Sequence, residues 1–333
     1  MKIATLLNEL ILQFSPFSSY AIKKIHSSHL ISQKQFDVGL KDYYHYLLQL
    51  FERVLTEHPS SRGNFAFEVP QFPKTFWGAE VYQLCLQIEH TLVKPGGRGA
   101  ESAERGMIPI DSLRGNYLVR LAHLEKLQAA DLIIEYSRSN LKNINTSKQF
   151  PDILKKMVQI APTLYPLVTT HHANTLRTIE CATLFRNMNE PRRKTFFEGL
   201  LAEHLPVQNI NHVFDHIENT YAQIKVLVNI RQTDHHDTLE ELRVLPALRC
   251  GVIVISEAAP LLKECRYSDF IIWGKLEELP ALIQEVLDNY DAFYKKIFQS
   301  AHFQRRMQRL ETANYLKVQR IVRNSNAPSV HHS

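Results

Sequence analysis

The alternation of apolar runs and polar loops is clearest between Ile224 and Glu257. Two runs rich in β-branched residues, Val226–Ile230 and Val252–Ile255, predict buried strands. Between them lie a polar loop, Arg231–Asp237, and a helix-like segment that is closed by Gly251. This order predicts a βαβ unit, and a polar loop after a parallel strand is where α/β proteins usually bind their ligands.

The N-terminal half shows a related alternation. Residues 1 to about 60 predict helix, because apolar side chains recur at helical spacing near the end of this stretch. A strand is predicted at Val81–Ile88, a helix at Tyr117–Ala130 and a second strand at Asp131–Tyr136. Ser137 then opens another helix. Strands that alternate with helices indicate an α/β fold.

The C-terminal half continues in the same way. A strand at Thr178–Phe185 leads into a helix with Pro191 in its first turn, a position that suits proline. The remaining predicted elements are a strand at Asp269–Trp273, a helix at Leu279–Tyr290 and helices from Tyr294 to Val322.

The length of the chain, 333 residues, favours two domains over one compact core. The segment PTLYP, residues 162–166, contains two prolines and interrupts the alternation of predicted strands and helices, so we expect the linker there. We therefore predict an N-terminal α/β domain at residues 1–165, a C-terminal α/β domain at residues 166–300 and a helical tail at residues 301–333.

Composition narrows the class of ligand. The net charge is +5, but Lys and Arg are mixed with Asp and Glu along the chain, which argues against nucleic acid and suits a small phosphate-bearing molecule. The four cysteines form no CxxC pair, which indicates reduced thiols. No stretch approaches the ~20 apolar residues that span a bilayer, and no signal-peptide cleavage site is evident. We expect a soluble cytoplasmic protein, with peripheral membrane contact left open.

A basic segment stands at one predicted strand-to-helix junction, residues 186–194. Backbone N–H groups and the helix dipole favour an anion there, and arginine binds phosphate oxygens bidentately. The alternative is a solvated basic first turn. The glycines of a P-loop are absent. The candidate diphosphate ligands are Asn187, Asn189, Arg192, Arg193 and Lys194.

The polar loop after Ile230 carries two adjacent histidines, His235 and His236. Their spacing matches no metal-binding motif, so we expect no metal and interpret the loop as a contact for substrate. Thr238 and Glu241 fit a capping box at the start of the next helix. Glu240, Glu241 and Arg243 of that helix could contact the same substrate, although Glu240 and Arg243 could also pair with each other.

His90 follows a predicted strand and precedes the glycine-rich segment KPGGR. A histidine in such a place could act as a general base or bind an acceptor hydroxyl. A structural histidine beside Glu89 explains the spacing equally well. Lys94 and Arg98 lie in the same loop and are further candidates for the acceptor side. Hydrolase and dinucleotide motifs, GxSxG and GxGxxG, are absent.

Four segments together resemble GT-B-type glycosyltransferases, and are most similar to uncharacterised sugar transferases of large DNA viruses and bacteria that build surface glycans. They are Ile88–Arg98, Ala130–Ile144, Phe185–Arg193 and Val228–Glu257. The resemblance implies a GT-B-like α/β fold, in which two Rossmann-like domains face a cleft and the C-terminal helix crosses back to the first domain. It also implies a nucleotide-sugar donor in the C-terminal domain, a glycan or glycoconjugate acceptor in the N-terminal domain, and no obligatory metal or other cofactor. The residues that would lie on the acceptor side are Glu89, Lys94 and Arg98. The residues that would bind the donor are Asn187, Asn189, Arg192, Arg193, Lys194, Asn229, His235, His236, Thr238, Glu240, Glu241, Arg243 and Ser256.

One departure from the family pattern leaves the stereochemistry open. Retaining members carry paired glutamates, but Pro246 and Thr238 stand roughly at those positions here. The carboxylate that contacts the donor would then be Glu240, Glu241 or Glu257, and Glu257 is a catalytic candidate. An inverting reaction needs a general base, for which His90 is the candidate. The alternative function is a non-catalytic α/β module that binds a nucleotide or a glycan.

Overall fold

The computed structural model describes residues 19–96, 103–111, 115–165, 167–168, 177–211, 215–232 and 238–325. The chain divides into two compact units, each built from separate segments. Unit 1 is Met1–Leu86, His123–Ile134 and Tyr315–Ser333, and unit 2 is Gln87–Ala122 and Glu135–Asn314. The division between residues 165 and 166 stays a prediction.

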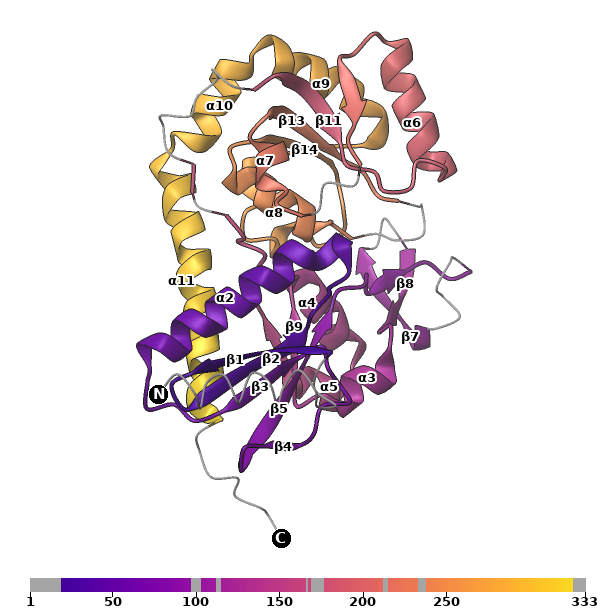
Figure 1. Ribbon diagram of the computed structural model, residues 1–333. Coiled ribbons are helices and arrows are strands. Elements are labelled where there is room, and N and C mark those ends of the chain that lie inside the picture. The colour runs from indigo at the N-terminus through magenta and orange to yellow at the C-terminus, as the bar shows by residue number, and fades with distance from the viewer. Residues whose placement is uncertain are drawn as a thin grey trace. The chain divides into compact units, whose positions relative to one another are not determined.

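Unit 1 is organised by a mostly parallel sheet with the strand order β1-β2-β3-β5-β9 (Figure 1). The first two strands form an antiparallel hairpin, and β2, β3 and β5 run parallel. The bounds are β1 Tyr20–Ile25, β2 Ser28–Gln33, β3 Asn64–Phe67, β5 Ala79–Gln87 and β9 Leu132–Glu135, with the short β4, Thr75–Phe76, paired to β5.

The prediction of helix over residues 1 to 60 is wrong for this hairpin, and residues 1–18 lie outside the described part. Within residues 19–60, the helix is α2, Lys41–Glu57, which follows a 3₁₀ turn at Val38–Leu40. In the hairpin, β2 pairs with the adjacent β1 on one side and with the distant β3 on the other, and this pairing outweighs the local pattern.

The core of unit 1 lies between α2 and the sheet. Phe51 of α2 is fully buried, and its ring centroid lies 5.5 Å from that of Phe65 and 4.9 Å from that of Phe67. The end of α11, Ala301–Asn324, also belongs to this unit. There the hydroxyl of Tyr315 donates a hydrogen bond to Glu57 of α2. The short α3, Leu124–Ala129, completes the described helices of unit 1.

Unit 2 contains a fully parallel five-stranded sheet with the order β12-β11-β13-β14-β15 (Figure 1). The order reverses between β11 and β13, and ligands of open α/β sheets bind outside the carboxyl ends of the strands at such a switch point. The strands are β11 Ile179–Thr183, β12 Val207–Asn209, β13 Ile224–Asn229, β14 Ile253–Glu257 and β15 Ile271–Gly274.

The predicted βαβ unit is confirmed as β13, α8 and β14. Helix α8, Glu241–Arg249, ends as the sequence predicts, at Gly251 with a positive φ of 75°. The N–H of Gly251 donates to the carbonyl of Leu248 at 3.0 Å, and the N–H of Val252 donates to that of Ala247 at 3.0 Å. These two bonds form a Schellman motif, which satisfies the last carbonyls of the helix.

The capping box predicted at the start of α8 is wrong. The N-cap residue is Glu240, and no side chain makes a capping hydrogen bond there. Thr238 instead directs its hydroxyl to the ring of His90. A contact with a residue 148 positions away therefore takes the place of the local cap.

In the five-stranded sheet, Val226, Leu227, Ile253 and Val254 of the central strands are fully buried, as expected for a parallel sheet. The helix predicted with Pro191 in its first turn is confirmed as α6. Further helices of unit 2 are α4 Arg138–Ser147, α5 Pro151–Lys156, α6 Pro191–Ala202, α7 Glu218–Tyr221, α9 Leu279–Asp288 and α10 Tyr290–Phe298, with 3₁₀ turns at Leu262–Glu264, Ser268–Phe270 and Leu276–Glu278 and a short strand, β10, Met157–Gln159.

A small antiparallel sheet with the order β6-β8-β7 lies in the first segment of unit 2. Its strands are β6 Leu92–Val93, β7 Ala103–Asp111 and β8 Gly115–Arg120. The helix predicted from Tyr117 is therefore wrong up to His123, and only Leu124–Ala129 is helical. Tyr117 and Val119 are buried at a spacing of two, and Val119 pairs with Leu92 across the sheet. Among the described residues, no helix is long and apolar enough to cross a membrane.

Candidate functional site

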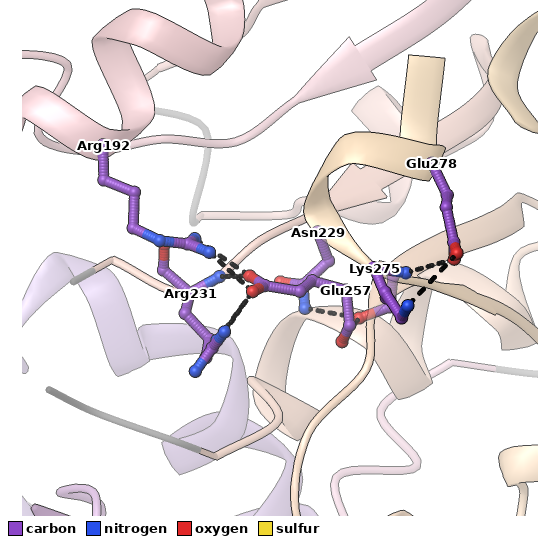
Figure 2. A network of polar contacts seen from close by, with 7 residues as sticks. Arg192, Asn229, Arg231, Glu257, Lys275 and Glu278 are labelled. Carbon is purple, nitrogen blue, oxygen red and sulfur yellow. Dashed lines mark hydrogen bonds and ion pairs between the residues drawn. The ribbon is translucent and has the colours of Figure 1, made fainter. Parts of the chain in front are cut away.

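Glu257, the last residue of β14, is the centre of an ion-pair cluster (Figure 2). Its carboxylate accepts two hydrogen bonds from Arg192 of α6, at 2.9 and 2.5 Å. It also accepts bonds from the backbone N–H of Arg231 at 3.1 Å and from its Nε at 2.9 Å. Burial raises the pKa of Glu257, but Arg231 and Arg192 outweigh this effect and hold the pKa below its ordinary value.

This geometry gives Glu257 a positioning role. Its side chain is 4% exposed, and those of Arg192 and Arg231 are 11% and 15% exposed. An ionised carboxylate bound by two guanidinium groups is poorly suited to exchange protons with a substrate. It instead ties the start of α6 to the loop after β13, on the two sides of the switch point.

Asn229, the last residue of β13, lies beside this cluster (Figure 2). Its side chain is buried, and its Nδ2 donates a hydrogen bond to the hydroxyl of Ser256 at 3.0 Å. The Oδ1 of Asn229 has no hydrogen-bond partner in the described part of the chain. A buried carbonyl oxygen at a strand end is an acceptor for a ligand hydroxyl.

The basic segment at the start of α6 divides into buried and exposed members. Arg193 is 4% exposed, and its guanidinium lies 4.8 Å from the ring centroid of Phe185. Burial first, and then the charge of Arg243, lowers the pKa of Arg193 to about 10. Lys194 is exposed and lies 3.8 Å from Glu198 on the helix surface.

Asn187 and Asn189 are exposed and form a local turn. The Oδ1 of Asn187 accepts a hydrogen bond from the N–H of Asn189 at 3.0 Å. Arg193 is therefore the buried cation of the predicted phosphate site, while Arg192 is bound to Glu257 and Lys194 lies outside.

His90 lies beside the start of α8. The sequence predicts an acceptor-side role for His90 and a donor-side role for the start of α8. Its Nδ1 lies 2.5 Å from the hydroxyl oxygen of Thr238, and its Nε2 lies 3.7 Å from a carboxylate oxygen of Glu240. Burial raises the pKa of Glu240, but His90, Arg243 and Arg193 together lower it below its ordinary value. Glu240 thus interacts with the imidazole and with the buried Arg193.

Glu241 is turned into the interior. It is 3% exposed and accepts hydrogen bonds from Ser137 Oγ at 2.5 Å and from the hydroxyl of Tyr267 at 2.7 Å. Burial is the main cause that raises its pKa. The structure therefore gives Glu241 an internal role and leaves Glu240 beside His90.

The remaining predicted residues lie at the edges of the site or outside the described part. Glu89 is half exposed and lies 3.6 Å from Arg120, and Lys94 is partly buried after β6. Arg98, His235 and His236 lie outside the described residues. The carboxyl ends of β13 and β14 bring Asn229, Ser256 and Glu257 together. The expectation that the protein needs no metal stays a prediction.

Sequence reasoning missed Arg231 as a site residue, although it directly follows β13. Its position as the first charged residue of the polar loop could have indicated it. Glu135, Ser137, Asn140 and Tyr267 were missed because their signal is a set of contacts between distant segments.

Comparison with known proteins adds the following. No family model matches the chain. It is 29% identical over 112 residues to the uncharacterised protein R358 of Acanthamoeba polyphaga mimivirus, a match that covers 32% of this chain and 40% of the viral protein. The chain thus spans less than half of the length of that relative.

Two of the solved structures that the chain resembles are glycosyltransferases. One is an α-glucosyltransferase in complex with UDP and a 13-mer DNA containing a HMU base, at 10% identity and a TM-score of 0.39, covering 78% of this chain and 79% of that one. The other is CalG4, the calicheamicin glycosyltransferase, at 12% identity and a TM-score of 0.35, covering 87% and 83%.

Proposed function

We propose that the chain is a glycosyltransferase that moves a sugar from a nucleotide-sugar donor to a hydroxyl group of a glycan or glycoconjugate. The observation that carries this proposal is the buried Arg193 at the switch point of the unit 2 sheet. A site that binds the leaving nucleoside diphosphate needs positive charge that is already in place and shielded from water.

The charges around Arg193 favour an anion. Arg243 and Arg192 both lower its pKa, so like charges oppose its protonated form, while Glu240 and Glu190 act in the opposite direction. Bound phosphate oxygens would relieve this repulsion and accept charge-assisted hydrogen bonds. The same guanidinium groups would stabilise the charge that develops on the diphosphate as it leaves, so we propose that the reaction needs no metal.

His90 is the proposed general base if the reaction inverts the anomeric centre. It would take the proton of the acceptor hydroxyl while that oxygen forms a bond to the anomeric carbon. The bond from this carbon to the diphosphate breaks, and the nucleoside diphosphate leaves with the electron pair. Glu240 would stabilise the imidazolium that forms, and Thr238 would orient the ring.

The test uses two adjacent cations that differ in burial. Arg193→Gln removes the buried charge, and Lys194→Gln removes the exposed one as a matched control. We expect Arg193→Gln to weaken binding of UDP, GDP or dTDP by about 10- to 100-fold, as expected for loss of a charge-assisted hydrogen bond. Binding of the matching nucleosides should change little, and Lys194→Gln should change neither.

Calorimetric titration measures both affinities, and Arg193→Lys shows whether charge alone restores them. Turnover is measured as free nucleoside diphosphate released from a panel of UDP-, GDP- and dTDP-sugars, with and without EDTA. Equal losses of nucleotide and nucleoside would place the phosphates elsewhere. Failure of every donor to bind or react would refute the glycosyltransferase proposal.

A non-catalytic binding module is the second candidate. The observation that favours it is that Glu257, one of the catalytic candidates, accepts hydrogen bonds from two arginines and is therefore poorly suited to act in catalysis. Nucleotide binding that depends on Arg193, combined with no transfer from any donor, would support this second function.

A further inference from the structure

His90 and Glu240 are each followed by a buried polar residue, and both of these residues reach the same short segment. Thr91 follows His90 and is fully buried, and Glu241 follows Glu240. Thr91 contacts Asn140 and Asn143 of α4, and Glu241 contacts Ser137, the N-cap residue of that helix. We call Glu135, Ser137, Asn140 and Asn143 the α4 clamp.

The side of the clamp that holds Thr91 contains two hydrogen bonds to one hydroxyl group. Thr91 Oγ1 donates to Asn140 Oδ1 at 2.9 Å and accepts from Asn143 Nδ2 at 2.9 Å. Asn140 Nδ2 in turn donates to Glu135 at 3.0 Å. All of these side chains are at most 1% exposed, so they have little freedom to move apart.

The side that holds Glu241 is built in the same way. Ser137 donates from its backbone N–H to Glu135 at 2.8 Å and from its hydroxyl to Glu241 at 2.5 Å. Tyr267 donates to the second oxygen of Glu241 at 2.7 Å. A continuous chain of hydrogen bonds thus runs from the residue after His90 to the residue after Glu240.

We propose that the α4 clamp positions the His90–Glu240 pair, with Thr91 and Ser137 as positioning residues. The expected effect on kcat rests on the proposed function, whereas the expected effect on the ring signals of His90 does not. Apolar side chains could fill this volume without the desolvation that buried polar groups require, so stability alone does not account for the clamp. The hydrogen bonds of this network instead favour one geometry, here between Thr91 and Glu241, although Glu135 Oε2 and Asn143 Oδ1 have no partner among the described residues.

The test removes one hydroxyl without a change of shape. Thr91→Val deletes both hydrogen bonds to Asn140 and Asn143, and Thr91→Ser keeps them. The control is Thr163→Val, because Thr163 is also buried and its hydroxyl also accepts a hydrogen bond from an asparagine, Asn314, at 3.1 Å. The long-range ¹H–¹⁵N NMR spectrum of the His90 ring, assigned with His90→Asn, reports the tautomer without any need for turnover.

We expect Thr91→Val to change the ring signals of His90 and to lower kcat by about 10- to 100-fold, as a small misplacement of a reacting group does. The affinity for nucleoside diphosphate should not change. Thr91→Ser and Thr163→Val should keep the wild-type ring signals and rate. In the His90→Asn background, Thr91→Val should cause no further loss of rate.

The outcomes separate the two proposals. Unchanged ring signals in Thr91→Val, alongside a loss of stability like that of Thr163→Val, would overturn the clamp. Altered ring signals without an effect on rate would support the clamp and reject His90 as the base. Altered ring signals in a protein that transfers no sugar would support the clamp and refute the glycosyltransferase.

Discussion

The ion-pair cluster at Glu257 leads to the most quantitative expectation. Glu257→Gln keeps the shape of the side chain but removes the negative charge that accepts hydrogen bonds from both Arg192 and Arg231. Loss of one member of a buried ion pair destabilises a protein by roughly 3–5 kcal/mol, because the partner charge stays buried. The amide retains one acceptor oxygen, and Arg192 also donates to the carbonyl of Arg231 at 3.2 Å. We therefore expect the lower end, about 3 kcal/mol.

Urea unfolding followed by tryptophan fluorescence measures this change. Trp273 lies in β15 and belongs to unit 2, whereas Trp77 belongs to unit 1. A Trp77→Phe background therefore restricts the signal to the unit that contains Glu257. The matched control is Glu198→Gln, whose carboxylate is 62% exposed and should change the stability by less than about 0.5 kcal/mol.

The same comparison predicts a pH dependence. The pKa of Glu257 is lowered in the folded protein, so its stabilising effect is present above its ordinary value of 4.5 and is lost as the pH falls through the folded pKa. The difference between wild type and Glu257→Gln should therefore shrink in acid. A variant as stable as Glu198→Gln at neutral pH, or a difference that persists in acid, would refute this reasoning.

Three further changes test other parts of the molecule. Burial raises the pKa of Glu135 well above its ordinary value of 4.5, so its ionisation opposes folding as the pH rises. In urea unfolding, Glu135→Gln should therefore become more stable relative to wild type as the pH is raised from acidic to alkaline. A stability difference that does not change with pH would contradict this. Gly251→Ala should lower the free energy of unfolding by about 2 kcal/mol, because φ is positive and the new Cβ would lie 2.9 Å from the side chains of Arg177 and Val168; an unchanged midpoint would contradict it. Trp77→Asn should raise the free energy of unfolding by up to about 1 kcal/mol, because the exposed Trp77 has a φ of 53° in a two-residue turn that favours asparagine; a lower free energy of unfolding would indicate that its ring contacts matter more.

The parts of the fold that are visible in the sequence are those with local causes. The βαβ unit around α8 is predictable because two β-branched strands and the glycine at the helix end are encoded within about 35 residues. The hairpin of β1 and β2 and the strand β8 are not, because β2 also pairs with the distant β3, and β8 pairs with β6 as well as with the adjacent β7. Pairing across a sheet overrides a weak local preference for helix.

The candidate site follows the same division. Strand ends identify Asn229 and Glu257, and a basic turn identifies Arg192 and Arg193. Sequence cannot tell that Arg192 neutralises Glu257 while Arg193 is buried against Phe185, since both facts depend on the packing of α6. The contact between His90 and Thr238 is equally invisible, because it joins residues 148 positions apart.

Unit 1 is built from separate segments of the chain, and this affects the order in which the two units are completed during synthesis. This unit draws on three stretches of the chain, and the last begins only at Tyr315. Tyr315 bonds to Glu57, and Gln319 lies 2.7 Å from His58, so the end of α2 obtains these partners only after the segments of unit 2, up to Asn314, have been made. The ribosome must therefore synthesise unit 2 before the last segment of unit 1. A nascent chain arrested short of this point carries an incomplete first unit, which would be exposed to chaperones and proteases until the final turns of α11 emerge.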